Sequence, residues 1–199
     1  RNILIKALQP LQAMGLKPVV ATELEFYLLK NGDSAVPQPQ LANVPGTNVE
    51  QSGTQYAMPE DLWDNDDFLE DVRKACELQN VPMTTVHSEF SPGQFEINLH
   101  HVDDPITACD HAVLLKRIIK GVARYHGMAA TFMAKPFMDV PGSGLHVHFS
   151  LYDEDGVDIH FLNRPPQIKI KSLDQVDTIL NDPPHGSTPL TRNLDIILD

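Results

Sequence analysis

Four short segments of the chain alternate apolar and polar side chains, and every one of them carries ionisable groups at its polar positions. The segments are residues 19–29, 86–89, 94–99 and 145–151. A period of two is typical of a β-strand with one buried face, because successive side chains of a strand point to opposite faces. The sequence therefore predicts four strands, each with an apolar face and a polar face.

The polar faces of these predicted strands are rich in possible ligands. In the first strand Glu23 and Glu25 share one face while Leu24 lies on the other. The other strands place the following residues on their polar faces: His87, Glu89, Glu96, Asn98, His146, His148 and Ser150. Exposed faces of antiparallel sheets are routinely polar, so one such strand is weak evidence for a site. Four in one chain favour a concave surface on which these groups meet: Glu23, Glu25, Glu89, Glu96 and His146.

A cluster of carboxylates with one imidazole predicts a site for Mg²⁺ or Mn²⁺. Zn²⁺ would normally recruit more histidine or cysteine and fewer glutamates. Closely spaced glutamates cannot all stay ionised without cations, so we expect two or more metal ions. Such ions bind phosphate oxygens in phosphoryl transfer. The alternative is a solvated acidic sheet face.

Helical patterns alternate with the strands. Apolar residues recur at helical spacing over residues 3–11, and Asp66 is the expected cap of a helix that runs to Asn80. Asp104 and Pro105 predict the start of a third helix, which would end near residue 126 and bury Cys109. We expect an α+β fold, a curved and mainly antiparallel sheet with helices packed on its outer face.

Composition limits the kinds of partner and the location that we expect for this chain. The chain has 199 residues and a formal net charge of -12, which disfavours nucleic acid. Its two cysteines, Cys76 and Cys109, suggest a cytoplasmic protein, and no apolar run predicts a membrane span. Residues 1–159 are the expected domain, whereas residues 160–199 are proline-rich and predict a loosely attached tail. The start at Arg1 without a methionine suggests a fragment.

The motifs of the chain resemble, in order, those of the catalytic domain of glutamine synthetases. The resemblance covers roughly residues 1–157, and the motif sequences are most similar to those of the γ-glutamylpolyamine (glutamate–putrescine ligase) branch. It is carried by Glu23-Leu24-Glu25-Phe26, His87-Ser88-Glu89, Pro92-Gly93-Gln94-Phe95-Glu96, Lys135-Pro136 and Gly142-Ser143-Gly144-Leu145-His146-Val147-His148.

The resemblance implies an ATP-dependent ligase that phosphorylates the γ-carboxylate of glutamate, so that ammonia or a putrescine-like amine can attack the acyl phosphate. It implies a substrate-side metal held by Glu25, Glu89 and Glu96, and an ATP-side metal held by Glu23 and His146. His148 and Ser150 would face the nucleotide and Gly142 the glutamate. Pro141 stands where many glutamine synthetases have asparagine.

The family resemblance further implies a homo-oligomer whose sites lie between subunits. An amino-terminal β-grasp domain and several phosphate-binding arginines of the family have no counterpart in this sequence, so we expect an incomplete chain. Two alternatives stay open: a catalytically incompetent fragment that keeps its metal- and nucleotide-binding site, and a metal-dependent hydrolase on a β-rich scaffold.

Overall fold

The computed structural model of the chain describes residues 1–32 and 36–159, and the tail predicted for residues 160–199 lies outside them. The elements follow the order α1 (Asn2–Ala13), β1 (Lys17–Lys30), α2 (Pro59–Asp64), α3 (Asp66–Leu78), β2 (Met83–Ser88), β3 (Gln94–Leu99), α4 (Pro105–Tyr125), β4 (Met128–Thr131) and β5 (Leu145–Tyr152). The three helices and four strands expected from the sequence are all present, and the short helix α2 and the short strand β4 are added to them.

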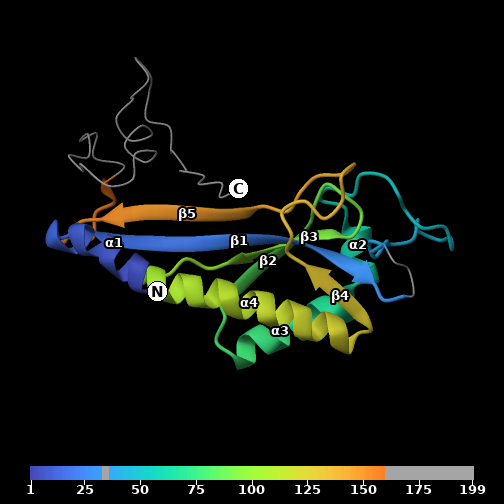
Figure 1. Cartoon of the computed structure of the whole chain (residues 1–199), viewed down its shortest axis with the longest axis horizontal. Helices are drawn as coiled ribbons and strands as arrows, with labels where there is room; N and C mark the ends of the chain where they lie inside the picture. Colours follow the sequence, from blue (N-terminus) through green and yellow to red (C-terminus); the bar gives the residue numbers. More distant parts are fainter. Residues whose placement is uncertain (33–35, 160–199) are drawn as a thin grey trace, which may run out of the picture.

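The strands form one open, antiparallel sheet around β1, the longest strand (Figure 1). On one side β1 pairs with β3, which in turn pairs with β2. On the other side the first half of β1 pairs with β5 and its last residues pair with β4. This topology confirms the predicted α+β fold with a mainly antiparallel sheet.

The hydrophobic core lies between the sheet and the helices α3 and α4, which run beneath it in Figure 1. Leu24 and Phe26 of β1 and Ile97 of β3 are at most 1% exposed. They pack in one cluster with Leu115 and Ile119 of α4. Because neighbours along a strand alternate faces, burying this side of the sheet turns the glutamates of β1 and β3 toward the other side.

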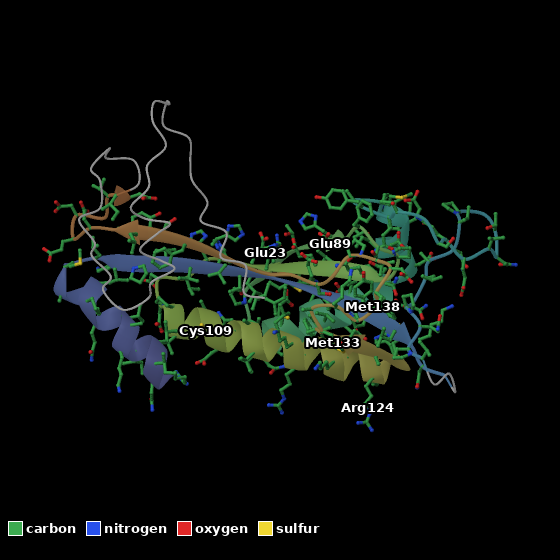
Figure 2. The ribbon with its side chains drawn as sticks, turned by 45° about the horizontal axis from the view of Figure 1, so that its top comes forward. Glu23, Glu89, Cys109, Arg124, Met133 and Met138 are labelled. Carbon is green, nitrogen blue, oxygen red and sulfur yellow. The ribbon has the colours of Figure 1, made fainter. Side chains whose placement is uncertain are left out.

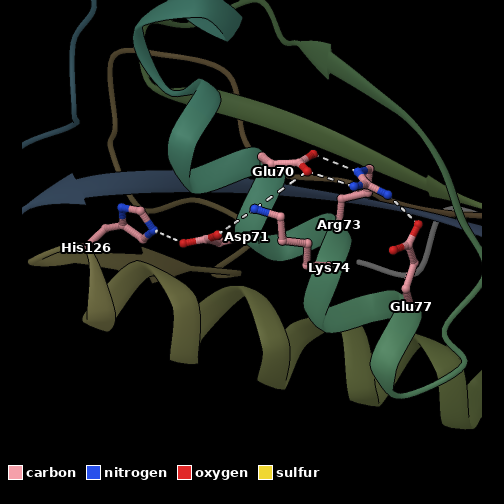
Figure 3. A network of polar contacts seen from close by, with 6 residues as sticks. All are labelled: Glu70, Asp71, Arg73, Lys74, Glu77 and His126. Carbon is pink, nitrogen blue, oxygen red and sulfur yellow. Dashed lines mark hydrogen bonds and ion pairs between the residues drawn. The ribbon is translucent and has the colours of Figure 1, made fainter.

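A polar contact near the end of α4 also joins this helix to α3 (Figure 3). His126, the C-cap of α4, places Nε2 2.9 Å from Asp71 Oδ2 on α3. Arg73 pairs with Glu70 and Glu77 along the exposed side of α3. Exposed pairs of this kind contribute little to stability, so the apolar core carries most of the packing energy.

The structure corrects two details of the helices. The N-cap of α3 is Asn65 and not Asp66, because α2 ends directly before it and shifts the helix start by one residue. Cys109 is exposed and not buried. The buried stripe of α4 passes through Ala108, Leu115 and Ile119, and Cys109 lies roughly a quarter turn away from it.

No helix within residues 1–32 and 36–159 combines the length and the apolar character needed to cross a bilayer.

Candidate metal centre

The centre of the polar sheet face is the pair formed by Glu23 on β1 and His146 on β5. The two residues are directly opposite each other in the antiparallel register, and His146 Nδ1 lies 3.3 Å from Glu23 Oε2. Asn98 is opposite Glu23 on the other side, in β3, and its Nδ2 donates to Glu23 Oε1 at 3.3 Å. Figure 2 shows Glu23 on the side of the sheet away from helix α4.

Glu96 of β3 completes a cluster of three possible ligands. Its Oε2 lies 3.8 Å from His146 Nδ1, although β1 runs between the strands that carry the two residues. The side chains therefore lean toward each other over the central strand. One ligand atom each from Glu23, Glu96 and His146 lies within 4.8 Å of the others. An ion placed between them would meet two carboxylates and one imidazole.

The electrostatics of this cluster favour a cation. Burial, and after it the nearby charges of Glu23, Glu89 and Glu25, raise the pKa of Glu96 to about 7, while His146 opposes the rise. Burial also raises the pKa of Glu89, with a contribution from Glu25. A divalent cation would offset this repulsion and let the carboxylates stay ionised together. The donor set thus fits a hard divalent ion such as Mg²⁺ or Mn²⁺.

Glu25 and Glu89 lie beside the three-residue cluster and not within it. Glu25 is opposite Glu96 in the register of β1 and β3. Glu89 follows β2 in the turn of the hairpin, half-buried, and its Oε2 accepts from the Phe90 amide at 3.3 Å. All five predicted metal residues therefore lie on or next to the same face, and Glu23, Glu96 and His146 form its most compact part.

His148 and Ser150 extend this face along β5 into a groove of about 400 Å³ next to Glu23. His148 Nε2 lies 2.9 Å from Glu23 Oε1. The walls of the groove include Val19, Ala21 and Tyr152. The two residues that the sequence assigns to the nucleotide thus line one groove that begins at a predicted metal ligand.

Gly142 belongs to the loop 132–144, which connects β4 to β5. A Cβ on Gly142 would lie 2.2 Å from the carbonyl oxygen of Ala134, so the close approach of two loop segments requires glycine there. The neighbouring carbonyl, that of Pro141, accepts a hydrogen bond from the buried hydroxyl of Tyr27 at 2.7 Å. The substrate-binding role assigned to Gly142 stays a prediction.

Gln94 and Asn98 hydrogen-bond to two of the predicted ligands, and neither was given a role from the sequence, although Asn98 was placed on the polar face of its strand. Gln94 donates to Glu25, Asn98 donates to Glu23, and Tyr27 holds the loop. Period-two spacing was the available signal for Gln94 and Asn98, because both share the face of Glu96. Tyr27 carried the same signal, since it lies two residues after Glu25.

Most of the chain is similar to known proteins. Residues 1–168 match the family model described as glutamine synthetase, catalytic domain. The chain is 42% identical over 159 residues to gamma-glutamylputrescine synthetase PuuA of Escherichia coli (strain K12). The matched residues are 80% of this chain and 34% of that protein. The chain is 38% identical over 159 residues to glutamate–isopropylamine ligase of Pseudomonas sp., with the same coverage.

Among solved structures, a complex of GmaS with ADP has the same fold, with a TM-score of 0.66 and 24% identity over 79% of this chain and 34% of that chain. The chain thus spans about a third of the length of the relatives it matches. The family model covers most of the chain, and three residues of the family-like motifs, Glu23, Glu96 and His146, meet on one sheet face. The chain belongs to the glutamine synthetase family.

Proposed function

We propose that this chain supplies the cation and nucleotide side of a ligase site that joins the γ-carboxylate of glutamate to a small amine, coupled to cleavage of ATP. The observation that carries the proposal is the convergence of Glu23, Glu96 and His146 on one face of three strands. Two relatives are named for γ-glutamylputrescine synthesis and for glutamate–isopropylamine ligation. We therefore favour an amine over ammonia as the second substrate.

The ligation has two steps. An oxygen of the γ-carboxylate attacks the terminal phosphorus of ATP, which forms γ-glutamyl phosphate and releases ADP. The amine nitrogen then attacks the acyl carbon, the carbon–oxygen bond to phosphate breaks, and the nitrogen loses a proton as phosphate leaves. Both steps build negative charge on phosphate oxygens, which bound Mg²⁺ or Mn²⁺ would neutralise.

The described residues can be assigned to the two halves of this chemistry. Glu25, Glu89 and Glu96 would hold a cation on the substrate side, and Glu23 and His146 one on the ATP side. Glu96, 3.8 Å from His146, would then lie between the two cations. The nucleotide would lie along β5 in the groove next to Glu23, against His148 and Ser150. Gly142, in the loop beside this face, would contact glutamate. Support for this division comes from the register, which sets His146 opposite Glu23 and Glu96 opposite Glu25.

We extend the proposal to assembly and location. The protein would act as a homo-oligomer in the cytoplasm, with neither nucleic acid nor membrane as partner. The net charge of -12 and the two unpaired cysteines agree with it. Size-exclusion chromatography with light scattering tests the assembly.

Manganese binding tests the centre directly. Titration calorimetry of the 199-residue chain should show Mn²⁺ binding that Glu96→Gln weakens by at least about tenfold, because a carboxylate ligand is lost. The matched control is Glu77→Gln, an exposed glutamate on α3 that pairs with Arg73. Equal Mn²⁺ affinity in the wild type and in Glu96→Gln would refute the centre.

Turnover is a separate measurement. The chain is incubated with ATP, Mg²⁺, glutamate and either putrescine or ammonia, and phosphate and γ-glutamyl product are measured. Product that depends on the amine supports the ligase. Mn²⁺ binding without product would instead indicate a binding portion without turnover, and phosphate release that is independent of the amine would indicate a hydrolase.

A further inference from the structure

Gln94 is a buried glutamine at the start of β3, 1% exposed, and its side chain joins a glutamate of the sheet to the loop 132–144. Its Nε2 donates to Glu25 Oε2 at 2.9 Å and to the carbonyl oxygen of Gly142 at 3.0 Å. We propose that Gln94 is a positioning residue. It fixes which oxygen Glu25 presents to a cation, and it fixes the distance between Glu25 and the loop. This inference rests on the cation centre proposed above.

The chemistry around Gln94 determines how its amide is oriented. At one end of the Gln94 amide lie the Glu25 carboxylate and the Gly142 carbonyl, which can only accept hydrogen bonds. The atom of Gln94 that faces them must therefore be its NH₂ nitrogen. At the other end the backbone amide of Ser91 donates to Oε1 at 3.3 Å. A flipped amide would set its oxygen against a carboxylate and a carbonyl. Gln94 therefore has one favourable orientation.

The backbone of Gln94 is held as firmly as its side chain. Its carbonyl oxygen accepts from the Glu89 amide at 2.9 Å and from Nε2 of the buried Gln55 at 2.6 Å. Its own amide donates to the Ser91 carbonyl at 3.0 Å. A side chain on a fixed base, with its polar atoms bonded, can transmit position from one neighbour to another.

For Glu25 the consequence is that its two oxygens have different roles. Oε2 is occupied by Gln94, whereas Oε1 points toward Gly144 and His146. A Cβ built on Gly144 would lie 2.8 Å from Glu25 Oε1 and 3.2 Å from His146 Nε2. The oxygen left free by Gln94 is thus the one on the His146 side, and a carboxylate anchored at one oxygen loses less freedom when it binds an ion.

For the loop, Gln94 is one of three side chains that donate to successive carbonyls, and Lys135, which donates to the carbonyl of Val140, lies within the loop itself. Tyr27 donates to the carbonyl of Pro141 and Gln94 to that of Gly142. Between these two residues, Gln94 is the one that also contacts a proposed metal ligand. This difference supplies a matched control, because Tyr27→Phe removes a loop tether and leaves the hydrogen bond between Gln94 and Glu25 in place.

The test compares Mn²⁺ affinity by calorimetry with hydrogen exchange of the Ser143 amide, which donates to the Ala134 carbonyl inside the loop. Gln94→Leu removes both donors at nearly constant size, and Gln94→Met serves if that variant folds poorly by circular dichroism. We expect either variant to weaken Mn²⁺ binding by roughly 10- to 100-fold, as loss of a partner that orients a ligand does, and to speed exchange at Ser143. Tyr27→Phe should speed the exchange and keep the Mn²⁺ affinity within about twofold.

A merely structural role for Gln94 would change the exchange and leave Mn²⁺ binding unaltered. If Glu96→Gln abolishes Mn²⁺ binding while Gln94→Leu and Gln94→Met bind as the wild type does, the positioning role is refuted and the cation centre stands. If the wild-type chain binds no Mn²⁺, both the centre and the role of Gln94 beside it are refuted.

Discussion

Glu23 is the residue on which three strands of this protein meet, and His146 is its direct partner, with Nδ1 3.3 Å from Glu23 Oε2 across the β1–β5 pairing. Asn98 reaches the same carboxylate from β3, and His148 reaches it from two residues further along β5. A carboxylate that accepts from Asn98 and lies against two imidazole rings has little freedom to move. The pairing of β1 with β5 is therefore what turns a polar sheet face into a candidate binding site.

The metal-free chain should become more stable when Glu96 is replaced by glutamine. Burial and neighbouring carboxylates raise the pKa of Glu96 to about 7 from its ordinary value of 4.5. The folded state then binds the proton more tightly than the unfolded state, so stability falls as the pH rises from 4.5 to 7 and stays low above that. Urea unfolding in EDTA at pH 8 should show a gain of about 1–3 kcal/mol for Glu96→Gln, and a smaller gain at pH 5.

Gly144 should be required for cation binding and not for folding. A Cβ at this position would crowd Glu25 Oε1 at 2.8 Å, so Gly144→Ala should lower Mn²⁺ affinity at least about tenfold. Gly121 in α4 is the matched control, since a Cβ there would meet nothing within 4 Å. Gly121→Ala should leave binding unchanged and raise stability by about 0.5–1 kcal/mol. Wild-type Mn²⁺ affinity in Gly144→Ala would contradict this geometry.

Asp61 in α2 should make stability depend on pH at a position away from the metal centre. It is 1% exposed, and burial, aided by Asp64 and Glu60, raises its pKa to about 6 from 3.8. Because the pKa is higher in the folded state, ionised Asp61 lowers the free energy of unfolding. This loss of stability is absent below about pH 4 and complete above about pH 6. Asp61→Asn should gain about 1–3 kcal/mol at pH 7 relative to the wild type, measured by denaturant titration, and nothing at pH 4. An equal gain at both pH values would contradict the assignment.

Ile119 should carry a large share of the packing between α4 and the sheet. It is 0% exposed within the core cluster that includes Leu24 and Phe26. Ile119→Ala should cost about 2–5 kcal/mol of unfolding free energy, because it leaves a cavity in a packed core. Val113 on the same helix is 68% exposed, and Val113→Ala should change stability by less than about 0.5 kcal/mol. Similar losses in the two variants would show that α4 is not anchored by its buried stripe.

The sequence predicted the strands and the capped helix α4 because these depend on local patterns. Alternation put Glu23 and Glu25 on one face with Leu24 on the other, and the structure has the same alternation of burial along β1. Asp104 caps α4 with its side chain, which accepts from the Ile106 amide at 3.0 Å. The family resemblance added the division of these residues between two metal ions and the roles of His148, Ser150 and Gly142.

Local patterns could not determine what depends on pairing and packing. Alternation gives the face of a side chain and not the strand beside it, so the 3.8 Å approach of Glu96 to His146 over β1 required the sheet order. Helical spacing likewise could not tell that Cys109 is exposed, since the face of α4 that is buried depends on where the sheet lies. Nor could it show that the Gln94 amide joins Glu25 to a loop 48 residues away.

The sequence alone thus determined which groups this protein offers to a cation, through the alternation that sends Glu23, Glu25, Glu96 and His146 to the polar face. The tertiary structure decided which of them meet, because the antiparallel register of β1 with β3 and β5 sets Glu23 and His146 opposite each other and brings Glu96 within reach of both. Distances between strands are a property of pairing, and pairing is fixed by contacts between residues far apart in the chain.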